Sequence, residues 1–153
     1  MTDDTILARI QVEMTAAMKA RAAERLSTLR MLKASIMEAR TKKPKDAPFS
    51  ADEEIEVLQR YVKKRRESIE EFRKIGREDM VPNEEREIVV TQAFLPSQLG
   101  EDEVRALVKE AVATTGAVTP KDMGKVMGAL MGKVKGRAEG SLVSRLVKEA
   151  LGG

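Results

Sequence analysis

The 153-residue sequence contains no cysteine and no histidine. Without cysteine, the chain can form no disulfide and offers no thiolate as a nucleophile or metal ligand. Without histidine, it lacks the commonest general base, the usual partner of a serine nucleophile and the most frequent metal ligand. We therefore expect no catalytic residue, no metal site and no cofactor in the chain on its own.

Aromatic residues are scarce as well: they make up 3% of the chain, and none follows Phe94. Proteins that read unpaired bases usually stack them on aromatic side chains. A nucleic acid that binds the C-terminal part would therefore be recognised by its backbone and shape, and we expect no DNA sequence specificity.

Long apolar runs are also missing. No stretch approaches 18 consecutive apolar residues, so the sequence predicts no membrane span. The first four residues are partly acidic and lack the basic start and apolar run of a signal peptide. We expect a cytoplasmic, monomeric protein that does not bind membranes.

Charged residues are abundant at 35%, together with alanine, leucine and nine methionines. Unbranched and small side chains lose little rotamer freedom in a helix, so the composition predicts an all-α fold. Apolar residues recur at helical spacing over residues 3–20, 51–75 and 139–151, among others. Ser50 and Glu53 predict a capping box at the start of the long helix.

Pro96 and Gly100 interrupt this helical pattern and mark the expected boundary between two helical subdomains. The first subdomain, residues 1–95, holds four predicted helices, and the second, residues 96–153, holds three. Arg65 falls in the apolar stripe of the long helix. Its guanidinium must therefore reach solvent or pair with a carboxylate.

Three glycines recur every four residues in the first helical segment after Pro120: Gly124, Gly128 and Gly132. Each costs about 1 kcal/mol relative to alanine within a helix, so some gain must offset them. We expect close packing against another helix. The alternative is a bare, lysine-flanked surface that a phosphate backbone can approach.

The C-terminal end is the basic part of the chain, because residues 116–153 carry seven basic side chains against three acidic ones. Lysine and arginine can contact phosphates there without reading a sequence, whereas a merely solubilising surface is the alternative. The six candidate nucleic-acid-binding residues are Lys125, Lys133, Lys135, Arg137, Arg145 and Lys148.

Two further basic clusters carry weaker signals. Residues 63–66 are followed by Glu67, Glu70 and Glu71, which favours a self-neutralised helix surface. The segment 40–48 contains two prolines and basic residues, which is typical of an exposed loop. A solvated loop is the favoured interpretation, and nucleic-acid contact is the alternative.

Several stretches together resemble the YqeY-like proteins. They are Leu29-Arg-Met-Leu-Lys-Ala-Ser-Ile36, Lys64-Arg-Arg-Glu-Ser-Ile-Glu-Glu-Phe72, Gly76-Arg-Glu-Asp-Met80, Phe94-Leu-Pro-Ser-Gln-Leu99 and Met123-Gly-Lys-Val-Met-Gly128, with Lys135-Gly-Arg-Ala138 and the last helix. The resemblance covers nearly the whole chain. It implies a two-part helical fold.

The C-terminal part of that family is similar to the tail domain of the B subunit of the glutamyl/aspartyl-tRNA amidotransferase. This similarity implies a surface for tRNA, because the tail domain helps to hold the tRNA body. It does not imply the amidotransferase chemistry, since the catalytic cradle with its ATP and metal site has no counterpart here. One departure is that Glu139-Gly140 stands where the tail usually has Asn-Pro.

Three functions remain open from the sequence. The first is a non-catalytic RNA-binding module, for tRNA or a tRNA-bearing complex. The second is an accessory subunit or amidotransferase-like protein in aminoacyl-tRNA amidation, a carbon–nitrogen ligase reaction with glutamine as amido donor. The third is a protein-interaction adaptor that uses the methionine- and glycine-rich helix, since methionine adapts to different partners.

Overall fold

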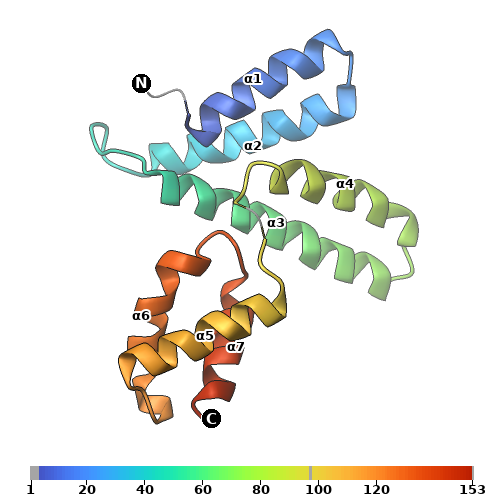
Figure 1. Ribbon diagram of the computed structural model, residues 1–153. Helices are drawn as coiled ribbons and strands as arrows, with labels where there is room; N and C mark the ends of the chain where they lie inside the picture. Colours follow the sequence, from blue (N-terminus) through green and yellow to red (C-terminus); the bar gives the residue numbers. More distant parts are fainter. Residues whose placement is uncertain (1–3, 97, 153) are drawn as a thin grey trace. The chain divides into compact units, whose positions relative to one another are not determined.

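A computed structural model describes residues 4–96 and 98–152, so Asp3 and Ser97 lie outside the described residues. All regular structure in this part is helical and no strand occurs in it, which confirms the predicted all-α fold. The chain forms two compact units, Met1–Leu95 and Pro96–Gly153, which are described separately (Figure 1).

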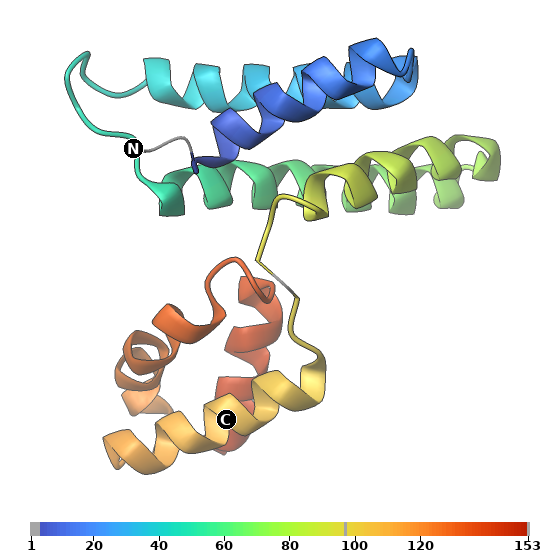
Figure 2. The same ribbon diagram turned by 45° about the horizontal axis from the view of Figure 1, so that its top comes forward.

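The N-terminal unit consists of two helical hairpins. Helices α1 (Ile6–Lys19) and α2 (Ala23–Thr41) form the first hairpin. Helices α3 (Ala51–Lys74) and α4 (Val81–Gln92) form the second, joined by the short 3₁₀ helix η1 (Glu78–Met80). The two hairpins lie as two layers (Figures 1 and 2). The most deeply buried side chains between them are Ile10, Leu29, Leu32, Ile36 and Leu58.

Polar side chains fix the starts of α1 and α3. The capping box predicted at α3 is present: the Glu53 amide donates to Ser50 Oγ and the Ser50 amide donates to Glu53 Oε1, each at 3.1 Å. At α1, the Glu54 carboxylate of α3 accepts the amides of Ile6 and Leu7 at 3.2 and 3.0 Å. Glu54 is only 5% exposed. A buried charge therefore satisfies two helix-terminal amides across the layer.

Arg65 pairs with carboxylates of α4, as one of the two sequence alternatives predicted. Its guanidinium nitrogens lie 3.6 Å from Glu84 and 3.8 Å from Glu87. The Tyr61 hydroxyl donates to Glu87 at 2.6 Å, and the Arg65 guanidinium lies over the Tyr61 ring at 4.6 Å. Burial and the neighbouring Glu87 raise the pKa of Tyr61, which keeps this hydroxyl a donor.

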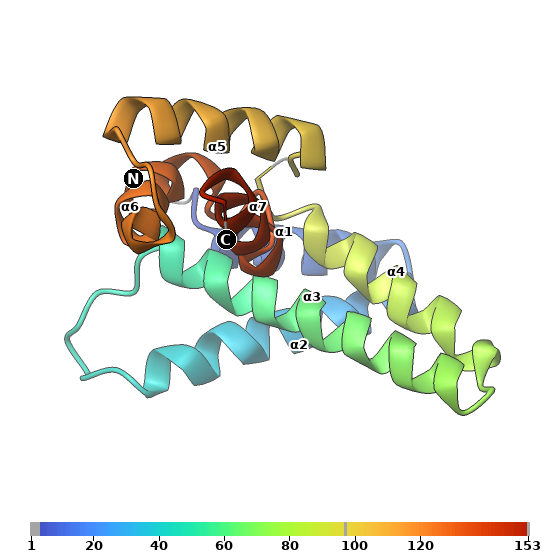
Figure 3. The same ribbon diagram turned by 90° about the horizontal axis from the view of Figure 1, so that it is seen from below.

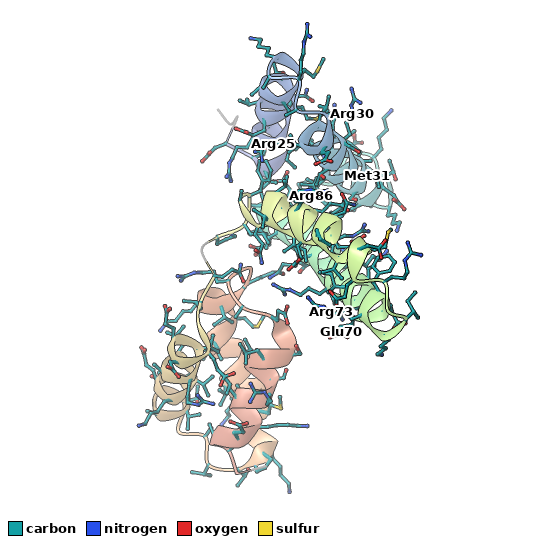
Figure 4. All side chains as sticks on the ribbon, turned by 90° about the vertical axis from the view of Figure 1, so that its right-hand side faces the viewer. Arg25, Arg30, Met31, Glu70, Arg73 and Arg86 are labelled. Atoms are coloured by element: carbon teal, nitrogen blue, oxygen red, sulfur yellow. The ribbon has the colours of Figure 1, made fainter. Side chains whose placement is uncertain are left out.

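Other ion pairs of this unit lie at its surface. Figure 4 views the side on which Arg25 and Arg30 of α2 and Arg86 of α4 lie. Arg86 pairs with Glu24 at 3.3 Å and thereby links α4 to the start of α2. At the end of α4, Arg9 of α1 donates to the carbonyl oxygen of Ala93 at 3.3 Å and lies over the Phe94 ring at 5.4 Å. The last residues of the unit are therefore held against α1.

The C-terminal unit is a three-helix arrangement of α5 (Glu101–Thr115), α6 (Met123–Val134) and α7 (Gly140–Ala150), with the 3₁₀ helix η2 (Pro120–Asp122) before α6. Figure 2 shows the three helices around one centre. The apolar side chains of α6 point inward, since Val126, Leu130 and Val134 are buried. Valines of α5 and α7 complete the core: Val104, Val108, Val143 and Val147.

Candidate nucleic-acid interface

The glycine stripe of α6 lies on the surface, so the prediction that it packs closely against another helix of the unit is wrong. Gly124, Gly128 and Gly132 are all exposed. A methyl group built at any of the three would meet no atom of the unit within 4 Å beyond the adjacent residues and backbone of α6 itself. The inward face of α6 is occupied by its valines and leucine, which leaves the glycines on the opposite face. The alternative, a bare helix surface, fits the structure.

A turn between α6 and α7 carries two of the candidate cations, Lys135 and Arg137. Gly136 between them is buried and has φ +79°, in the left-handed region that favours glycine. The Arg137 amide donates to the Val134 carbonyl at 2.8 Å. Two cations therefore flank a backbone position that only glycine adopts without strain.

The interdomain segment fastens this turn from outside. The Leu99 amide donates to the Arg137 carbonyl at 2.7 Å, and Gln98 Nε2 donates to the Gly136 carbonyl at 3.1 Å. Leu99 also packs against the apolar core of the C-terminal unit. Sequence reasoning treated this segment only as a boundary. The signal that it missed is the pair Gln98 and Leu99, an amide side chain and an apolar residue shortly after Pro96.

Arg145 and Lys133 pair with carboxylates, which sequence reasoning did not foresee. Arg145 of α7 contacts Glu101 at 2.8 Å and Glu149 at 3.1 Å. Its hydrogen bond holds the pKa of Glu101 below the usual range. Lys133 of α6 contacts Glu110 of α5 at 3.2 Å. A phosphate would have to compete with these carboxylates for either cation.

The other two candidates, Lys125 and Lys148, are exposed on α6 and α7, and neither takes part in an ion pair recorded among the described residues. Lys125 follows Asp122, whose carboxylate accepts the amides of Val118 and Thr119 at 3.0 and 3.2 Å. These amides lower the pKa of Asp122, and the charge of Lys125 adds to the effect. Asp122 is thus a cap for the start of its helix.

The six cations therefore come from three places, namely the outer face of α6, the turn after it and α7. Lysine and arginine side chains can attract phosphates without base recognition. Among residues 4–96 and 98–152, no group of three or more acidic side chains is placed to hold a metal ion. No helix in this part of the chain is long and apolar enough to cross a bilayer.

The sequence model of one protein family, described as "Yqey-like protein", matches residues 7–151. The chain belongs to this family. The YqeY-like chain is also similar to the altered inheritance of mitochondria protein 41, mitochondrial, of Pyrenophora tritici-repentis (strain Pt-1C-BFP). The two are 33% identical over 115 residues, which is 72% of this chain and 61% of the relative. This YqeY-like chain thus spans about three fifths of that curated relative.

Proposed function

We propose that this YqeY-like protein is a non-catalytic RNA-associated module, with tRNA or a tRNA-bearing complex as its ligand. The observation that carries the proposal is the fastened turn at Gly136, which holds Lys135 and Arg137 on either side of a fixed backbone. Cations on a preorganised element lose less conformational freedom on binding than cations on a mobile segment. Two exposed lysines, Lys125 and Lys148, add to the positive charge of the unit, and these two take part in no recorded ion pair.

The test compares tRNA binding at two salt concentrations for wild type and for a variant with Lys125, Lys135, Arg137 and Lys148 all changed to glutamine. Each lost phosphate contact should reduce the slope of log K against log salt by about 0.7–0.9. We expect weaker binding and a slope lower by about 3. Circular dichroism melting checks that the variant is folded.

A matched control changes Lys133 and Arg145 to glutamine. Because carboxylates already engage these two cations, the control should bind tRNA almost as wild type does. Unchanged affinity and slope in the fourfold variant would contradict the proposed surface. A larger loss in the control than in the fourfold variant would place the phosphates on Lys133 and Arg145 instead.

The adaptor function is the second candidate, and the exposed glycine face of α6 favours it. Helix backbones can approach one another closely at glycine, and nothing in the unit covers this face. Copurification before and after RNase treatment separates the two functions. A partner that stays bound without RNA supports the adaptor, whereas loss of all partners supports RNA association.

Two further features belong to the proposal. We place the protein in the cytoplasm. The word "mitochondrial" is part of the name of the fungal relative and describes that protein. A ligase activity in aminoacyl-tRNA amidation is tested by incubating the purified protein with glutamine, ATP and charged tRNA. We expect no amide transfer, because the chain supplies neither histidine nor cysteine.

A further inference from the structure

The loop between α2 and α3 encloses an open pocket of about 600 Å³. The loop extends away from the helices of its unit (Figures 1 and 3). Its walls are Met37 and Arg40 from the end of α2, Lys43 and Lys45 from the loop, and Phe49 just before α3. Three cations and one aromatic ring line this pocket, and no carboxylate is among its described lining residues.

Phe49 is the aromatic wall. Its side chain packs against the core of the N-terminal unit, but the residue is only partly buried and also lines the pocket. The Arg40 guanidinium and Lys43 Nζ lie 5.9 and 5.8 Å from the ring centroid. An aromatic ring with cations near it is the combination that proteins use to stack an unpaired base and hold its phosphates.

The loop is held in place, because Lys43 joins its end to the first turn of α3. Lys43 Nζ donates to the Pro48 carbonyl at 2.6 Å and to Glu53 Oε1 at 2.7 Å. This hydrogen bond is the main reason that the pKa of Glu53 is lowered. Within the loop, the Ala47 amide donates to the Pro44 carbonyl at 2.9 Å. Lys43 is thus a positioning residue.

Arg40 and Lys45 have a different role from Lys43. Neither takes part in an ion pair recorded in the described part of the chain, so both charges are available to an anion. Both line the same pocket as Phe49. The pocket thus combines available positive charge with an apolar, planar surface, which a nucleotide matches through its phosphate and its base.

We propose that this pocket binds one unpaired nucleotide of an RNA, with the base stacked on Phe49 and the flanking phosphates on Arg40 and Lys45. The proposal rests on the proposed RNA association but uses the other unit of the protein. Stacking on a ring accepts any base, so the pocket selects single-stranded RNA without selecting a sequence.

The probe is a 5′-phosphorylated pentaadenylate, and its matched control is an abasic pentamer with the same number of phosphates. The protein has no tryptophan, so Phe49→Trp in the full chain introduces a single tryptophan in the pocket, whose emission can be excited apart from that of Tyr61. We expect pentaadenylate to quench its emission and the abasic pentamer to leave the emission unchanged.

Binding of labelled pentaadenylate then separates the contributions. Phe49→Leu keeps an apolar side chain against the core and should weaken binding by about tenfold or more. Its affinity for the abasic pentamer should not change. Changing Arg40 and Lys45 together to glutamine should weaken both probes and lower the salt slope by about 1.4. Lys63→Gln on α3 lies outside the pocket and should bind as wild type does.

Equal binding of the two probes would overturn the proposal, because it would show a surface that binds any polyanion. Absence of pentaadenylate binding, or of quenching, would overturn it too. The two proposals fail separately. If the fourfold C-terminal variant binds tRNA normally while pentaadenylate still quenches the tryptophan, only the C-terminal surface is wrong. If the fourfold C-terminal variant binds tRNA more weakly, while Phe49→Leu binds tRNA as wild type does and pentaadenylate does not quench the tryptophan, only the pocket is wrong.

Discussion

The two units of this protein are both small helical assemblies, but their interiors differ in chemistry. The buried polar side chains recorded among the described residues, Thr28, Glu54 and Thr91, all belong to the N-terminal unit. That unit also contains every aromatic residue of the chain. The core of the C-terminal unit consists of valine, leucine and alanine, and its recorded ion pairs lie at the surface.

The difference shows two ways of specifying a helical fold. In the N-terminal unit, the buried Glu54 and the partly buried Arg65 form interactions that only one arrangement of the hairpins satisfies. In the C-terminal unit, the packing of small β-branched side chains specifies the arrangement of the helices, and the recorded ion pairs remain at the surface. The first unit should therefore be sensitive to loss of single polar groups, and the second to changes of backbone conformation.

The largest expected effect is that of Glu54→Ala. The substitution leaves the amides of Ile6 and Leu7 without their acceptors at the buried start of α1. Hydrogen bonds to a charged group each contribute about 1.5–3 kcal/mol, so we expect a loss of at least about 2 kcal/mol in the free energy of unfolding. Urea unfolding followed by circular dichroism measures it. Glu54→Gln keeps one acceptor oxygen, so its stability should lie between those of wild type and Glu54→Ala. Equal stability of all three proteins would contradict the assigned role of Glu54.

In the C-terminal unit, two glycine substitutions should act in opposite directions. Gly136→Ala forces a side chain into the left-handed region and should cost about 1–2 kcal/mol. Gly128→Ala adds a methyl group in open space on a helix and should stabilise by up to about 1 kcal/mol. The two variants are compared by thermal melting under identical conditions. A lower melting temperature for Gly128→Ala would restore the rejected packing interpretation.

The smallest effect concerns Glu84, whose pKa is raised by burial despite the nearby Arg65. A carboxyl whose pKa is raised on folding contributes stability only while it is protonated, and that stability is lost as the pH rises through the folded pKa. The ionised form therefore costs stability at pH 7. Arg65 Nε and Glu84 Oε2, 3.6 Å apart, are both buried without a hydrogen bond among the described residues. The attraction of Arg65 therefore offsets only part of the cost of burying the ionised Glu84.

Glu84→Gln should consequently be slightly more stable than wild type at pH 7. The difference should shrink as the pH falls, because wild-type Glu84 then becomes neutral, and it should vanish below the ordinary glutamate pKa of about 4.3. Urea unfolding at a series of pH values follows this difference. A variant that is less stable at pH 7 would show that attraction to Arg65 outweighs the burial of Glu84.

The features that sequence predicted well are local ones. The Ser50–Glu53 capping box needs only residues three apart, and the helices expected over residues 51–75 and 139–151 need only helical periodicity. The prediction for Arg65 was also sound, because a charged residue in an apolar stripe leaves few physical solutions. The all-α class followed from such signals added along the chain.

The features that sequence reasoning missed depend on which distant residues meet. The cost of three glycines in α6 showed that a reason was needed, but not that the face is open. The pairing of Arg145 with Glu101 joins residues 44 positions apart, so no helical spacing could reveal it. The pocket at Phe49 likewise needs the folded loop, because the ring and its cations surround a space that a linear pattern does not contain.

The anchored ends of the interdomain segment have one further consequence. Arg9 holds Ala93 and Phe94 on one side, and Gln98 and Leu99 are fastened to the Gly136 turn on the other. Only three residues lie between these anchors, so the units are joined by a very short tether. An RNA bound by one unit would meet the other at an effective concentration in the millimolar range or above, provided that the tether allows both to reach it. Weak contacts in each unit would then combine into strong avidity, and lengthening the tether would reduce it without removing a single contact.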